Sequence, residues 1–245
     1  MAMAIPITAF THGNCHLDTV AIQILYNADS TRWARITDKF QFLKTVVPSD
    51  YRSVFDSVQQ AYPRIEADIL ASISRFSSEW SNYEASWYLF LSELFECGFP
   101  NETVFSAGVG IANISPRSIA TKEFIIPYYA PPSIASIVIA HETSHFFYYK
   151  SITNSSATQT HPYLDWIISE ALVPIIFSLP EVKSLFPFPL PSTSYAVSEK
   201  LIDTIEHEMS PTRTSISWLK KREAILVHVR SLITEYQMGS SNVRN

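Results

Sequence analysis

The stretch His141-Glu142-Thr143-Ser144-His145 decides how this chain of 245 residues is interpreted. Two histidines four residues apart lie on one face of an α-helix, so both imidazoles can reach the same metal ion. The glutamate beside the first histidine can accept a proton from a metal-activated water. The pattern therefore predicts a helix that carries two metal ligands, His141 and His145, and a general base, Glu142.

The surrounding residues predict that this motif helix runs from 132 to 150. Pro131 and Pro132 stand where the first turn of a helix tolerates proline, and residues 133–140 contain neither glycine nor proline. The polar stretch 150–156 predicts the end of the helix. We expect one face to pack inward, because apolar residues recur there at helical spacing with the two histidines: Ile134, Ile137 and Val138.

A third ligand is expected from a second helix over residues 162–178. On this helix Glu170 shares a face with Trp166 and Val173, so its carboxylate should point into the protein. A buried carboxylate needs a compensating charge, which a zinc ion supplies. Zinc held by three protein ligands keeps a fourth position open, as a hydrolytic site requires.

Two other residues near this second helix are alternatives. His161 stands just before the helix and is the second choice as third ligand. Asp165 lies about 130° around the helix from Glu170, so it is not expected to share the metal. Asp165 should either contact a metal ligand without binding the metal itself or face solvent.

The pattern His-Glu-x-x-His followed by a glutamate 25 residues later resembles the gluzincin clan of zinc metallopeptidases. Residues 166–172, Trp-Ile-Ile-Ser-Glu-Ala-Leu, are similar to the Trp-Leu-x-Glu-Gly-Phe-Ala type of motif in that clan. The match spans roughly 45 residues, from about Ser133 to Phe177. The resemblance implies one zinc ion per chain, and a peptide or protein substrate whose peptide bonds are hydrolysed. The implied ligands are His141, His145 and Glu170, with Glu142 as general base and proton shuttle.

The departures from the clan leave the subfamily unassigned. The aminopeptidase branch carries Gly-x-Met-Glu-Asn upstream, whereas residues 108–113 read Gly-Val-Gly-Ile-Ala-Asn and contain no glutamate. A dedicated aminopeptidase is therefore not favoured. The thermolysin-like branch has an aspartate four residues after the ligand glutamate, where this chain has Pro174. Another residue must then orient the histidine.

The resemblance and the residue patterns together predict an α+β, zincin-like fold in one domain, residues 1–245. A small mixed sheet with an edge strand should lie over the active-site helix, with helical lobes beside it. Residues 19–129 should supply the strands and helices of an upper lobe, and residues 192–238 a C-terminal helical part after a proline-rich connection. Strands are predicted over three stretches: 19–26, 103–107 and 123–129.

Substrate-binding residues are predicted on the last of these strands. Pro127 cannot donate to a β-ladder, which suggests an edge strand. In the clan, the strand before the motif helix pairs with an extended substrate, and this role would fall on Phe124, Ile126 and Tyr128. An ordinary half-buried edge strand explains the pattern equally well.

A further electrophile should stabilise the oxyanion, and in the clan it is a tyrosine or histidine from the later helical part. The candidates are Tyr195, His207 and His228. The sequence does not choose among them.

Composition excludes other classes of function. The net charge of −5 and the lack of a Lys/Arg-rich block argue against a nucleic-acid partner. No run of 18 apolar residues predicts a transmembrane segment, and residues 1–7 do not resemble a signal peptide, so a cytoplasmic location is expected. The oligomeric state is not predicted. The alternatives to a peptidase are a non-peptidase zinc hydrolase and a catalytically inactive zincin-fold binding protein.

Overall fold

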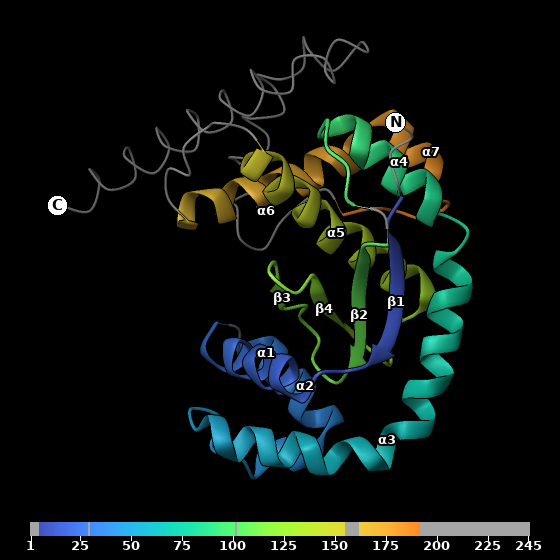
Figure 1. The fold of residues 1–245 in the computed structure, drawn as a ribbon. Helices are drawn as coiled ribbons and strands as arrows, with labels where there is room; N and C mark the ends of the chain where they lie inside the picture. Colours follow the sequence, from blue (N-terminus) through green and yellow to red (C-terminus); the bar gives the residue numbers. More distant parts are fainter. Residues whose placement is uncertain (1–4, 29, 101, 155–161, 192–245) are drawn as a thin grey trace, which may run out of the picture. The chain divides into compact units, whose positions relative to one another are not determined.

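The computed structural model of the chain describes residues 5–28, 30–100, 102–154 and 162–191. This part of the chain has an α+β architecture, with one small mixed sheet and a majority of helices (Figure 1). The chain divides into two compact units. The first consists of Met1–Ala85 and Phe99–Thr143, and the second of Ser86–Gly98 and Ser144–Asn245.

The four-stranded sheet belongs to the first unit. Its strands are β1 (Ile7–His12), β2 (Val104–Gly110), β3 (Arg117–Ser118) and β4 (Glu123–Pro127), in the spatial order β1-β2-β4-β3. The pairs β1–β2 and β2–β4 are parallel, and β3 pairs antiparallel with β4. The central strands β2 and β4 are largely buried, as their nearly continuous apolar sequences require.

Two predicted strands are confirmed, but the predicted edge position is wrong. The prediction at 103–107 corresponds to β2, which continues to Gly110, and the prediction at 123–129 corresponds to β4, which ends at Pro127. The outer strands are β1 and β3, because residues 117–118 fold back against the start of β4. Pro127 is tolerated in this inner strand because it occupies the last position, where its missing N–H does not interrupt the ladder.

The strand predicted over residues 19–26 is wrong, because this segment lies in helix α1 (Cys15–Ala28). Its buried residues Asp18, Ala21 and Leu25 are three and four positions apart, which is a helical period. The apparent alternation included Ile24 and Tyr26, both of which are exposed. The first strand within the described residues is instead β1, whose mixed exposure pattern shows no strong alternation.

The first unit also contains α2 (Ser30–Lys39), the 3₁₀ helix η1 (Gln41–Lys44) and α3 (Tyr51–Trp80). Asp50 caps α3 by accepting a hydrogen bond from the backbone N–H of Arg52. Figure 1 shows a marked bend in α3, and Pro63 inside this helix supplies the usual cause of a kink.

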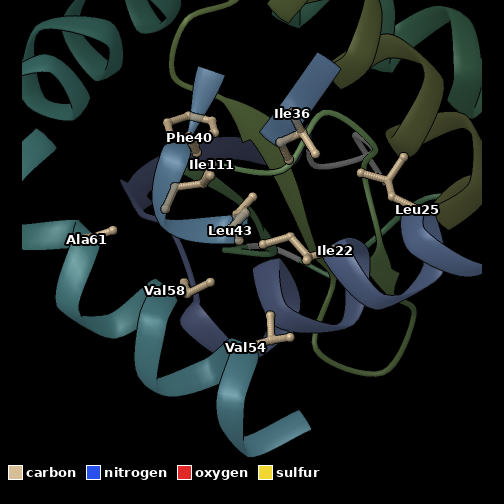
Figure 2. Close-up of a cluster of buried hydrophobic side chains, with 9 residues drawn as sticks. All are labelled: Ile22, Leu25, Ile36, Phe40, Leu43, Val54, Val58, Ala61 and Ile111. Atoms are coloured by element: carbon tan, nitrogen blue, oxygen red, sulfur yellow. The ribbon is translucent and has the colours of Figure 1, made fainter. Parts of the chain in front are cut away.

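The hydrophobic core of the first unit forms where α1, α2, η1 and α3 meet the end of β2 (Figure 2). Helix α1 buries Ile22 and Leu25, and α3 buries Val54, Val58 and Ala61, at three- and four-residue spacing, so each presents one apolar face to this core. The buried members of this core are Ile22, Leu25, Ile36, Phe40, Leu43, Val54, Val58, Ala61 and Ile111.

The second unit is helical in its described part. It contains most of α4 (Glu84–Leu94), the end of α5 (Pro132–Asn154), α6 (Pro162–Ser178) and α7 (Pro180–Leu185). The helix predicted over 162–178 is confirmed at both ends, and the motif helix predicted to end at 150 continues to Asn154. Residues 192–238, predicted as a C-terminal helical part, lie outside the described residues. In the part that the structure describes, no helix is long and apolar enough to cross a membrane.

The inward face predicted for α5 is wrong in its first half. Ala135, Ile139 and Ala140 are fully buried, whereas Ile134 is 46% exposed. Ile137 and Val138 are only partly buried. The helix is apolar on more than one side before the motif, so spacing alone did not single out the buried face.

A buried carboxylate joins three elements of the first unit. Asp18 of α1 is fully buried, and its Oδ1 accepts hydrogen bonds from the backbone N–H groups of Ile111 at 3.1 Å and Ala112 at 2.7 Å. The Tyr62 hydroxyl of α3 donates to its Oδ2. A Cβ on Gly110 would collide with the Asp18 carboxylate, which explains why glycine ends β2. Burial raises the pKa of Asp18, against the lowering effect of these hydrogen bonds.

We predict that Asp18 makes stability depend on pH. The raised pKa means that the folded protein holds the Asp18 proton more tightly than the unfolded chain does. This contribution to the free energy of unfolding is complete below the ordinary pKa of 3.8 and is lost as the pH rises through the folded-state pKa. Asp18→Asn keeps an oxygen that can accept hydrogen bonds from both backbone N–H groups. In this variant the free energy of unfolding should fall less steeply as the pH rises. Urea denaturation midpoints across a pH series measure the difference. Parallel declines in wild type and variant would contradict the assignment.

Candidate metal centre

Helix α5 carries the motif as the sequence predicts. His141 is partly buried and His145, one turn later, is fully buried. Thr143 between them is also buried, and its hydroxyl donates to the Ile139 carbonyl at 2.7 Å. The helical spacing therefore presents both imidazoles from a single rigid element.

Glu170 is the buried acid that the sequence predicts on the second helix. Its side chain is 0% exposed on α6, and most of the described side chains of this helix are also buried. Its Oε1 lies 3.5 Å from Nε2 of His145, in the same unit. The apolar surroundings of α6 make an uncompensated negative charge costly, so a cationic partner belongs beside this carboxylate.

The donor set fits a zinc ion. The ligand atoms of His141, His145 and Glu170 all lie within 4.8 Å of one another. In a tetrahedral site with bonds of about 2.1 Å, neighbouring ligand atoms are about 3.4 Å apart. The 3.5 Å between His145 and Glu170 matches that edge. Two imidazoles and one carboxylate are also the ligand types that catalytic zinc sites use with one position open.

The predicted general base, Glu142, lies against an arginine that sequence reasoning missed. The Arg117 guanidinium donates through Nη1 to Oε2 of Glu142 at 3.3 Å. Their side chains are only 9% and 5% exposed. The arginine lies on β3, a strand of two residues with no periodic signal, and 25 residues before its partner.

A second polar contact ties α5 to α6 within the second unit. The Tyr148 hydroxyl donates to Oδ1 of Asp165 at 3.1 Å, and both residues are buried. The expectation that Asp165 could face solvent is therefore wrong. Tyr148 follows His145 by three residues and Asp165 precedes Glu170 by five, so this bond fixes the two helices close to the ligands.

The other predicted site residues lie on strand β4, just after it, or outside the described part of the chain. Phe124 is fully buried, and its backbone pairs with Ala107 of β2 and with Arg117 of β3. The substrate-binding role predicted for this strand stays a prediction. Ile126 is also buried, and Tyr128 follows the end of β4. The remaining predicted residues lie outside the described part of the chain: His161, Tyr195, His207 and His228.

Comparison with known proteins gives no independent assignment. No protein-family model matches the chain, and neither the curated proteins nor the solved structures include a significant match. The interpretation of the site therefore depends on its own geometry and on the motif.

We predict that the purified chain binds about one zinc ion and that Glu170→Gln binds it much more weakly. The amide keeps the shape of the side chain but removes the charge that compensates the metal. Elemental analysis after dialysis measures the stoichiometry, and the zinc-dependent rise in melting temperature measures the affinity. Glu181→Gln, an exposed change on α7, is the matched control. Equal zinc retention by Glu170→Gln and wild type would contradict the ligand assignment.

Tyr148→Phe should lower the free energy of unfolding by about 1–3 kcal/mol, because it leaves a buried carboxylate oxygen without its donor. Chemical denaturation of the metal-free protein measures this loss. Tyr26→Phe, the same truncation at an exposed position of α1, should change stability by less than about 0.5 kcal/mol. Equal losses of unfolding free energy in the two variants would show that the hydrogen bond to Asp165 does not stabilise the fold.

Proposed function

We propose that the chain is a zinc-dependent metallopeptidase that hydrolyses peptide bonds. The observation that carries the proposal is the convergence of His141, His145 and Glu170, whose ligand atoms lie within 4.8 Å of one another, with Glu142 next to His141 on the same helix. A metal site that only stabilises the fold is usually closed by a fourth protein ligand. Among the described residues the group has three members, and this set with the adjacent carboxylate suits catalysis better.

When bound, zinc supplies Lewis-acid activation of a water molecule and of the scissile carbonyl. Side chains of the protein supply the ligands and the general base. His141 and His145 would hold the metal from one rigid helix, and Glu170 would bring the negative charge that balances part of its charge. Glu142 accepts the proton of the attacking water and then donates it to the leaving amine.

The proposal includes a zincin-like fold. Its support is the order of the elements, in which a small mixed sheet precedes the motif helix α5 and a second helix, α6, carries the third ligand. The choice of a peptide substrate is supported by the gluzincin resemblance of residues 133–177.

The test is Glu142→Gln in the full chain. We expect this variant to bind one zinc ion, because no ligand is changed, and to lose about 10²–10⁴-fold in kcat toward a peptide library, because general-base catalysis contributes about that much. Chelation should abolish wild-type activity, and added zinc should restore it. Glu93→Gln, an exposed change on α4, should leave kcat unchanged.

Three results would count against the proposal. Full activity of Glu142→Gln with bound zinc would exclude this general base. Zinc-dependent cleavage of esters but not of peptides would favour a non-peptidase hydrolase. Stoichiometric zinc with no hydrolysis of either substrate would favour an inactive binding protein.

A further inference from the structure

The ion pair between Arg117 and Glu142 is buried, unlike other ion pairs of the first unit. Its side chains are 9% and 5% exposed. In the pairs Arg52–Asp56 and Lys44–Asp38, the side chains are between 41% and 77% exposed. A guanidinium that leaves water loses hydration free energy, and a buried pair often contributes little net stability. The location of Arg117 therefore requires an explanation other than the stability of the fold.

Both members of the pair are attached to ordered backbone. Arg117 pairs with Phe124 in the β3–β4 ladder, and Phe124 is fully buried. Two residues earlier, the Ser115 hydroxyl donates to the Ile125 carbonyl at 2.6 Å. Glu142 lies in the middle of the 23-residue helix α5. The pair therefore joins two fixed points, and the guanidinium limits the positions that the carboxylate can adopt.

A general base must hold its accepting oxygen at a fixed place relative to the proton donor. A glutamate side chain has several rotatable bonds, whereas proton transfer requires an oxygen within about 2.6–3.2 Å of the proton donor. A displacement of about 1 Å can cost about 10²-fold in rate. Catalytic side chains are accordingly held by neighbours whose own conformations are locked.

We propose that Arg117 is a positioning residue that holds the Glu142 carboxylate in its working orientation beside the metal centre. This inference rests on the proposed function, since it assigns a role within the same reaction. Arg117 acts through Glu142 and is not assigned a contact with the metal or the substrate.

The first arm of the test needs neither metal nor substrate. A double-mutant cycle with Arg117→Ala, Glu142→Ala and the double variant is measured by urea denaturation of the metal-free full chain. We expect the double variant to be less destabilised than the sum of the two single variants, by a factor of about 5 or more in the unfolding equilibrium constant. Additive effects would overturn the inference, because the two side chains would then not interact.

The second arm separates kcat from KM in the zinc-loaded protein. Arg117→Ala should keep one zinc ion and a KM within about twofold of wild type, while kcat falls about 10–100-fold. Arg117→Lys restores the positive charge and should recover part of kcat. Arg52→Ala removes an exposed arginine that pairs with Asp56 and is the matched control, with kcat unchanged. If Arg117→Ala does not fold, Arg117→Gln takes its place in both arms.

The outcomes separate the inference from the proposed function. Loss of kcat at an unchanged KM, with recovery by lysine, would support positioning. An unchanged kcat in Arg117→Ala, while Glu142→Gln is inactive, would overturn the inference and leave the peptidase in place. A rise in KM alone would overturn it in favour of substrate binding. Absence of zinc-dependent hydrolysis in wild type would refute the proposed function, and the inference with it.

Discussion

Carboxylates that lie in the protein interior need compensation, and this requirement organises the candidate metal centre. Glu170 is 0% exposed on a helix whose described side chains are mostly buried, and Glu142 is 4% exposed one turn before His145. Removing such charges from water costs several kcal/mol each unless cations or donors face them. Nε2 of His145 lies 3.5 Å from Glu170, and the Arg117 guanidinium lies against Glu142.

The first unit meets the same requirement with hydrogen-bond donors. Asp18 is fully buried, and two consecutive backbone N–H groups and the Tyr62 hydroxyl donate to it. Burial also raises the pKa of Tyr62, so its hydroxyl keeps the proton that it donates. The bonds connect α1 and α3 to the segment that follows β2. The geometry leaves no room for a side chain at Gly110.

The elements that could be predicted are those whose signal is local. The proline-led helix α6 is predicted at both ends, and the central strands β2 and β4 follow from their apolar runs. Helix α1 was missed because its residues satisfy a period of two as well as the helical period, and only burial distinguishes the two. Strand β3 has two residues, and it exists because β4 offers it a partner.

The sequence by itself determined which residues of the motif share a helix face, because His141 and His145 are four positions apart. It also determined that Glu170 would face inward, since α6 is apolar around that position. Only the tertiary structure decided which residues complete the site. Arg117 reaches Glu142, and Tyr148 reaches Asp165, across 25 and 17 residues of chain. Such contacts depend on how the elements pack, which no local pattern of residues encodes.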